Sequence, residues 1–249
     1  MDGSVFDADH VICTVSLGVL KERYLGLFNP PLPQNKVDAI EGLSIGVVDK
    51  IYLEFDKPFW EEGWGGFSLL WKSEELKSIR EDTQFSWLED VFGFYTVDFQ
   101  PNILCGWISG AKARQMEQLP VDDVKRGAMF LLRTFLKSYD IPEPKAVERL
   151  EQAYSNGMII LFYPQIVFFR STWYSNPHFR GSYTFYSLKS DSLNVTTTQL
   201  SQPINDAVGL PVLQFAGEAT NQHYYSTVHG AVESGWREAK RLIDTYKNV

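Results

Sequence analysis

Residues 213–243, LQFAGEATNQHYYSTVHGAVESGWREAKRLI, predict how the end of this chain folds. The apolar run of Val212, Leu213 and Phe215 is typical of a strand, and a Gly-Glu-Ala-Thr turn follows at Gly217–Thr220. An amphipathic helix comes next. Its apolar or small positions recur at i, i+3, i+4 and i+7 and are expected to form the buried face: Val228, Ala231, Val232, Gly235, Ala239, Leu242, Ile243 and Tyr246. A strand, a tight turn and a helix N-terminus together predict backbone amides aimed at the polar edge of a cofactor.

Composition narrows the classes of function. The chain has 249 residues, enough for one large domain or two smaller ones with an apolar core. Its 31 acidic and 23 basic residues give a formal net charge of −8, which disfavours nucleic acid because binding phosphates needs clustered Lys and Arg. The same charge would suit a cationic substrate. Cys13 and Cys105 lie in apolar runs and are expected to be buried, reduced thiols.

We expect a cytoplasmic protein without a membrane partner. The sequence shows no signal peptide and no apolar run of about 18 residues that would span a bilayer. The final residues, Lys247-Asn248-Val249, differ from a peroxisomal signal of the Ser-Lys-Leu type.

The order of strands, loops and helices predicts a mixed α+β fold. Val11–Val15 is typical of a buried strand, and Asp49–Phe55 alternates charged and apolar residues as a half-buried strand does. Residues 67–71 and 103–108 are two further expected strands. A helix is expected from Pro120 to about Tyr139. Its expected inner positions are Val124, Ala128, Leu131, Leu132, Phe135 and Leu136.

Four blocks of sequence, in one order, carry a family resemblance. They are Ala8–Lys21 (ADHVICTVSLGVLK), Ile45–Trp60 (IGVVDKIYLEFDKPFW), Leu104–Gly110 (LCGWISG) and Thr172–Tyr183 (TWYSNPHFRGSY). Together with the segment at 213–243, they resemble the flavin amine oxidases, and specifically the branch of the spermine and acetylpolyamine oxidases. The resemblance covers most of the chain and corresponds to the C-terminal portion of the family.

The resemblance implies two interleaved domains. Residues 1–28 would be a returning segment of an FAD-binding domain, 29–180 a substrate-binding domain with a mixed sheet and flanking helices, and 181–249 the C-terminal segment of the FAD-binding domain. Two features depart from the family. The Gly-x-Gly-x-x-Gly motif of the dinucleotide-binding unit is missing from this sequence, and residues 146–165 form an insertion without a family counterpart.

The resemblance assigns three residues to the chemistry. Lys50, within Val48-Asp49-Lys50-Ile51-Tyr52, would bridge through a water to the flavin N5 atom. Tyr183 would present an aromatic face beside the flavin, and Thr227 occupies the partner position, where monoamine oxidases have a second aromatic residue. An exposed strand lysine, a sheet-packing tyrosine and a helix-capping threonine are the alternatives for these positions.

The implied cofactor is FAD. Its implied contacts are Glu218, Ser226, Thr227, Val228 and Trp173. Backbone amides at the start of the final helix would face the pyrimidine edge of the flavin, where the helix dipole favours negative charge. For Trp173, a plain core tryptophan is the alternative.

FAD is expected to be bound non-covalently, and no metal site is expected. Family members with covalent FAD carry a cysteine near the position of Trp173, whereas this chain has Ser171, Thr172 and Tyr174 there. His223 and His229 have no carboxylate or cysteine partner at a metal-binding spacing.

The implied activity is FAD-dependent oxidation of a polyamine carbon–nitrogen bond by O₂, which gives an aminoaldehyde, a shorter amine and H₂O₂. Spermine or an acetylated polyamine is the expected substrate. Monoamine oxidase and histone-lysine demethylase are weaker alternatives, and the demethylase branch shares the sequence at Arg180–Tyr183. Tyr224–Thr227 followed by Val228–Ala231 favours the polyamine branch.

A second interpretation is a chain without activity of its own. A truncated isoform or a partial gene product would explain both the missing motif and the insertion. Because small-ligand affinity depends on enclosure, such a chain would bind no FAD alone and would need a complementing N-terminal FAD-binding half.

Overall fold

The computed structural model describes residues 3–145 and 168–247, so the insertion expected at residues 146–165 lies outside the described residues. The chain forms two compact units: Val47–Ser175, and Met1–Gly46 together with Asn176–Val249. Both units mix helices and sheets, which confirms the predicted α+β class. Helix α2 (Gln34–Gly42) packs with helices α1 and α7 of the second of these units. The division into FAD-binding and substrate-binding segments stays a prediction.

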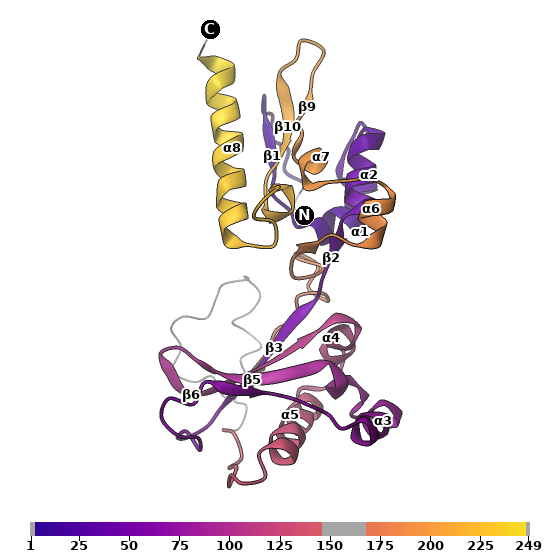
Figure 1. Ribbon diagram of the computed structural model, residues 1–249. Helices are drawn as coiled ribbons and strands as arrows, with labels where there is room; N and C mark the ends of the chain where they lie inside the picture. The colour runs from indigo at the N-terminus through magenta and orange to yellow at the C-terminus, as the bar shows by residue number, and fades with distance from the viewer. Residues whose placement is uncertain (1–2, 146–167, 248–249) are drawn as a thin grey trace. The chain divides into compact units, whose positions relative to one another are not determined.

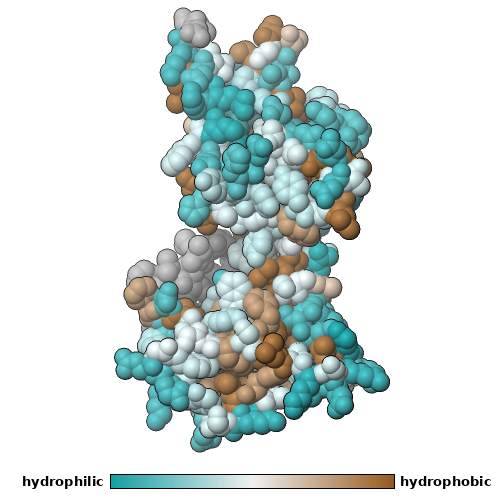
Figure 2. Space-filling view, in the orientation of Figure 1, coloured by the Kyte–Doolittle hydropathy of each residue, from teal (hydrophilic) through white to brown (hydrophobic). Residues whose placement is uncertain are grey.

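The Val47–Ser175 unit is built on an antiparallel five-stranded sheet with the order β4-β5-β6-β3-β7. The strands are β3 (Val48–Glu54), β4 (Gly66–Ser68), β5 (Val91–Val97), β6 (Gln100–Ser109) and β7 (Phe168–Arg170). The helices are α3 (Ser73–Glu81), the 3-10 helix η1 (Ser86–Asp90), α4 (Gly110–Glu117) and α5 (Val121–Phe135). Figure 1 shows α5 alongside the sheet, and Figure 2 shows hydrophobic side chains over the middle of this unit with hydrophilic ones at its margins.

The core of this unit follows from the predicted periodicities. In β3, Asp49, Ile51 and Leu53 are fully buried, whereas the residues between them are half-buried, so the alternation predicted for Asp49–Phe55 is confirmed. The inward residues of β3 pack with the inner face of α5, whose predicted members Val124, Ala128, Leu131 and Leu132 are buried. The helix ends at Phe135, earlier than the expected Tyr139.

The other unit contains two small sheets. Strand β1 (Val11–Cys13) pairs in parallel with β10 (Pro211–Phe215), which also pairs with β9 (Ile204–Asn205), and β2 (Ser44–Ile45) pairs with β8 (Thr184–Phe185). The helices are α1 (Leu17–Leu27), α2, α6 (Leu188–Ser192), α7 (Thr197–Ser201), the 3-10 helix η2 (Glu218–Thr220) and α8 (Val228–Tyr246). Their core includes Leu17, Leu20, Ile40, Leu43, Leu200 and Phe215. The strand, turn and helix predicted from residues 213–243 are therefore confirmed as elements.

The predicted burial of two elements in this unit is wrong. Strand β1 was expected to be buried, but Val11 and Ile12 are 52% and 39% exposed, because β1 is an edge strand that pairs with β10 alone among the described strands. The apolar stripe predicted to be the inner face of α8 is exposed as well: Val228 is 80% exposed and Ile243 is 56% exposed.

Helix α8 instead packs through a polar line. Its buried residues are Gly230, Ser234 and Glu238. The Glu238 carboxylate accepts hydrogen bonds from Arg237 Nε at 2.5 Å and from Arg241 Nε at 2.8 Å. The Arg237 guanidinium in turn donates to the backbone carbonyl of Phe215, at the end of β10. These charge-assisted bonds set the rotation of the helix and leave its apolar stripe facing outward.

A buried lysine ties two helices together in the same unit. Lys36 of α2 is 2% exposed, and its Nζ donates to the carbonyls of Gln199, Leu200 and Gln202 at 2.9, 2.8 and 2.5 Å. Nζ also lies 4.5 Å from the centre of the Phe215 ring. Burial lowers the pKa of Lys36 to about 8. The ammonium group thus donates hydrogen bonds to the carbonyls at the end of α7.

We expect Lys36→Met to lower the free energy of unfolding by about 3 kcal/mol, because methionine keeps the volume but leaves three buried carbonyls without a donor. Lys189→Met is the matched control: Lys189 is exposed and pairs with Glu41 at 3.7 Å, a surface contact of little weight. Chemical denaturation of both variants measures the difference. An equal effect of the two substitutions would contradict this role of Lys36.

Candidate functional site

Lys50 projects from the middle of the five-stranded sheet, on the face opposite to the core. It lies between the inward-facing residues Asp49 and Ile51 of β3 and pairs with Trp107 of β6. Its Nζ lies 4.4 Å from the centre of the Trp107 ring. An aromatic face attracts an ammonium group, so Trp107 holds the lysine side chain against the sheet.

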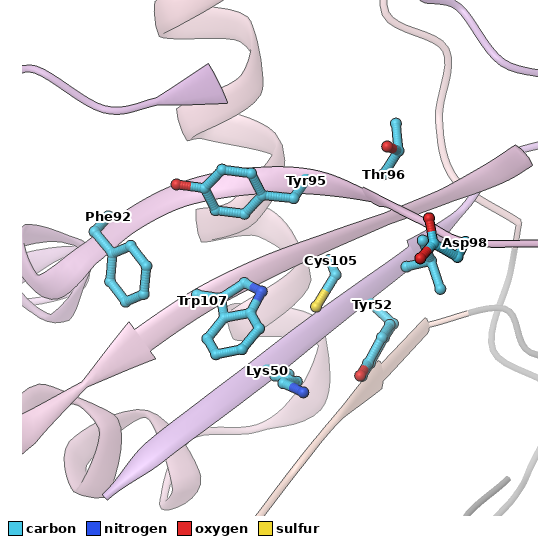
Figure 3. Close-up of a pocket in the computed structure, with 9 residues that line it drawn as sticks. Lys50, Tyr52, Phe92, Tyr95, Thr96, Asp98, Cys105 and Trp107 are labelled. Carbon is cyan, nitrogen blue, oxygen red and sulfur yellow. The ribbon is translucent and has the colours of Figure 1, made fainter. Parts of the chain in front are cut away.

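Lys50 lies in a groove with a volume of about 580 Å³ on this face of the sheet. Figure 3 shows the lining side chains, which come from the neighbouring strands β3, β5 and β6 and from the turn after β5. They are Lys50, Tyr52, Phe92, Tyr95, Thr96, Val97, Asp98, Cys105 and Trp107. The lining therefore combines aromatic walls with one cationic and one acidic side chain, which suits an extended molecule with apolar and cationic parts.

The groove contains residues that sequence reasoning did not assign. Trp107 and Cys105 belong to the LCGWISG block, and the two-residue period of β6 places them on the same face. Burial raises the pKa of the Cys105 thiol to about 11, so the thiol stays protonated near neutral pH and is no nucleophile there. Both cysteines are free; Cys105 is buried as expected, whereas Cys13 is half-buried.

Two buried carboxyl groups beneath the groove were also missed. Asp49 precedes Lys50 and is fully buried, and Glu117 at the end of α4 is 5% exposed. Burial and the neighbouring Glu117 carboxyl raise the pKa of Asp49 to about 7. The sequence did contain a signal for Asp49: it is an acidic residue at an inward position of an alternating strand, where an apolar residue is usual.

Trp173 lies in the loop that follows β7, within the same unit as Lys50. Its side chain is 39% exposed, and its backbone N–H donates to Asp49 Oδ1 at 3.4 Å. The loop is therefore attached to the strand that carries Lys50. Because Trp173 is partly exposed, it differs from the plain core tryptophan that was the alternative.

Glu218 organises the expected cofactor segment of the other unit. Its carboxylate accepts hydrogen bonds from the Thr184 hydroxyl at 2.8 Å and from the Ser226 N–H at 2.6 Å. The Ser226 hydroxyl donates to the carbonyl of Thr184. The side chains of Glu218 and Ser226 are thus engaged within the protein and hold β8 beside the start of α8. Tyr183 directly precedes this β8 contact and is 39% exposed.

Thr227 caps the N-terminus of α8. Its hydroxyl accepts the N–H of Gly230 at 3.0 Å and donates to the carbonyl of Tyr224 at 2.7 Å. In this structure, the Thr227 side chain therefore acts as a helix cap, which was the alternative role for this residue. The N–H groups of Val228 and His229 precede the first hydrogen bond of α8, and Val228 is 80% exposed.

The expected site residues fall into two groups. Lys50 and Trp173 belong to the Val47–Ser175 unit, and Tyr183, Glu218, Ser226, Thr227 and Val228 belong to the other. In residues 3–145 and 168–247, no cluster of His, Cys, Asp and Glu could hold a metal ion. Nor does any described helix have the length and apolar character needed to cross a membrane.

Comparison of the chain with known proteins identifies its family. The family model described as "Flavin containing amine oxidoreductase" matches residues 1–243. The chain is 37% identical over 248 residues to the peroxisomal N(1)-acetyl-spermine/spermidine oxidase of Bos taurus, and 34% identical to that of Homo sapiens. These alignments cover 97% and 98% of this chain but 44% of each relative, so the chain spans less than half the length of these relatives.

Solved structures give the same fold. A structure of putrescine oxidase bound to putrescine matches 95% of this chain and 43% of that protein, with a TM-score of 0.61 and 21% identity.

The close approach of the Tyr224–Thr227 turn to α8 provides a test of the cofactor segment. A Cβ atom at Gly230 would lie 2.0 Å from the Tyr224 carbonyl oxygen, whereas one at Gly235 of the same helix would meet nothing within 4 Å. We expect Gly230→Ala to push the turn away and lower the melting temperature. The control, Gly235→Ala, should instead stabilise by up to about 1 kcal/mol, because alanine has the higher helix propensity.

Thermal denaturation of the two variants measures both effects. A Gly230→Ala protein as stable as the Gly235→Ala protein would contradict the described packing of the turn.

Proposed function

Because the chain belongs to the flavin containing amine oxidoreductase family, we propose that it supplies the C-terminal portion of an FAD-dependent polyamine oxidase. The proposed reaction cleaves a polyamine carbon–nitrogen bond with O₂ and water, and yields an aminoaldehyde, a shorter amine and H₂O₂. Spermine or an acetylated polyamine is the proposed substrate, in agreement with the names of the bovine and human relatives. The cytoplasm remains the proposed compartment, although both of these relatives carry peroxisomal names.

The observation that carries this proposal is the position of Lys50. The side chain of Lys50 lies on the open face of the sheet, in an aromatic groove and against Trp107, instead of extending freely into solvent. A surface lysine with no role needs neither contact. The groove suits the alternating methylene and ammonium groups of a polyamine because aromatic rings attract both.

We propose that Lys50 Nζ orients a water molecule beside the reacting amine. Trp107 would restrict the lysine to the groove. Trp173, in the same unit as Lys50, and Tyr183, in the other unit, are each proposed to provide an aromatic face.

The segment around α8 fits one edge of a flavin. The glycine at position 230 lets the turn lie against the first turn of the helix, and the exposed amides there are hydrogen-bond donors. The proposed FAD contacts are Val228 and the backbone at Thr227, whereas Glu218 and Ser226 would act by holding the turn. FAD would supply the acceptor for the hydride that leaves the carbon next to the amine nitrogen, and we propose that it is bound non-covalently.

A second candidate is a chain that is inactive alone and needs a complementing N-terminal FAD-binding half. The exposed apolar residues of α8 and the open edge of β1 favour it, because such surfaces are usually covered by another element. The relatives have more than half of their length outside the matched region. We propose that this remaining part covers both surfaces and completes the flavin site.

The test is to co-produce the chain with the N-terminal part of the bovine relative that lies outside the match, and to measure H₂O₂ release from spermine and N-acetylated polyamines. We expect Lys50→Met to reduce the rate by about 10²-fold, the usual cost of losing the correct position of a reacting group.

Lys57→Met is the control for this assay, because Lys57 is an exposed lysine of the same unit that does not line the groove. Full activity of Lys50→Met, or an assembly that binds flavin but oxidises no polyamine, would contradict the proposed function.

A further inference from the structure

The carboxyl groups of Asp49 and Glu117 have no part in the proposed reaction, yet both are removed from water. Asp49 is 0% exposed and Glu117 is 5% exposed. Two adjacent buried carboxylates would repel each other and would each lose their hydration. A carboxyl pair in such a place therefore needs compensating hydrogen bonds or a proton.

The Glu117 carboxylate is saturated by backbone donors. Its Oε1 accepts the N–H of Tyr174 at 2.8 Å, and its Oε2 accepts the N–H of Ser175 at 2.6 Å. Both oxygens of Glu117 therefore face N–H donors of the loop.

The two oxygens of Asp49 differ from each other. Oδ1 accepts the hydroxyl of Ser171 at 2.7 Å and the N–H of Trp173 at 3.4 Å. Oδ2 is buried and meets no N–H or hydroxyl donor in the described part of the chain. A negative charge on Asp49 would be buried beside the Glu117 carboxyl, and burial and Glu117 both raise the pKa of Asp49. A proton on Oδ2 would remove this charge, so burial of the pair favours protonated Asp49.

These bonds fix the loop at residues 171–175 against the strand of Lys50. The backbone N–H groups of Trp173, Tyr174 and Ser175 are all held by the two carboxyls. Ser171 adds a second connection: its N–H donates to the Lys50 carbonyl at 2.9 Å, and its hydroxyl accepts the Lys50 N–H at 2.8 Å.

We propose that protonated Asp49 and Glu117 act as positioning residues, which clamp the loop of Trp173 onto the strand of Lys50. The inference rests on the roles proposed above for Lys50 and Trp173. Neither carboxyl would touch substrate. Together they would set the distance between the aromatic residue and the lysine.

The clamp weakens as pH rises. The open loop would leave Asp49 with the ordinary pKa of 3.8, whereas burial and Glu117 raise the pKa to about 7 in the closed loop. Between pH 3.8 and about pH 7, the closed form therefore binds one more proton than the open form. The stability that this proton gives to the closed loop is lost as pH rises through about 7. Two other charged groups lie nearby: Arg170 on β7, which attracts both carboxylates, and Arg114 on α4, which stacks on Tyr174 at 4.2 Å.

Hydrogen exchange at residues 173–175 tests the clamp in the 249-residue chain, without flavin or substrate. The protection factors of these amides give the equilibrium constant for closing the loop. In the wild type, we expect this constant to fall about tenfold from pH 6 to pH 8, because the pKa of Asp49 in the closed loop is about 7. Asp49→Asn should protect these amides at every pH and abolish the slope, because the amide N–H₂ imitates the protonated carboxyl. Glu117→Gln should lose protection at every pH, because an N–H₂ group would replace an oxygen that faces an N–H.

Asp98→Asn is the matched control, since Asp98 is an exposed carboxylate of the same unit, and it should keep the wild-type slope. The amides of β6 report whether each variant folds. Loss of protection in Asp49→Asn, whether confined to the loop or extending to β6, would overturn the proposal, as would a flat wild-type profile or full protection in Glu117→Gln. Because no turnover is measured, these outcomes are independent of whether the oxidase function holds.

Discussion

The register between β3 and β6 determines the geometry of the whole Val47–Ser175 unit. Seven residue pairs, from Val48 with Ser109 to Glu54 with Ile103, lock the two strands together. Because side chains alternate, this register puts Asp49 inside and Lys50 outside. A slip by one residue would bury the lysine and expose the carboxyl. The groove above the sheet and the loop clamp below it therefore depend on one ladder of backbone hydrogen bonds.

Buried polar groups, rather than apolar contacts alone, orient the segments that carry the expected site residues. Lys36 closes the end of α7, Glu218 joins β8 to the start of α8, and Glu238 sets the rotation of that helix. Each is satisfied by several hydrogen bonds, so each specifies one arrangement of its neighbours. The apolar stripe of α8 is exposed for the same reason, because Gly230, Ser234 and Glu238 form the side of the helix that packs against the rest of the unit.

Sequence periodicity correctly predicted β3, the α5 face and the strand–turn–helix order at 213–243, since these features depend on local pattern. It failed for the face of α8, because apolar spacing cannot show that buried Glu238 accepts hydrogen bonds from Arg237 and Arg241. Nor can it show that Arg237 donates to the Phe215 carbonyl. It also missed Glu117, whose partners lie more than fifty residues away in sequence. The family resemblance is confirmed, whereas the roles of Lys50, Tyr183 and Thr227 stay predictions.

The most direct test of the account is the visible flavin absorbance of the purified chain, alone and together with a complementing N-terminal half. In the described part of the chain, the apolar stripe of α8 and the edge of β1 are open. We expect a colourless chain alone and a yellow complex with the complement. A chain that purifies yellow by itself, with bound FAD that spermine reduces, would contradict the claim that the site needs a second half.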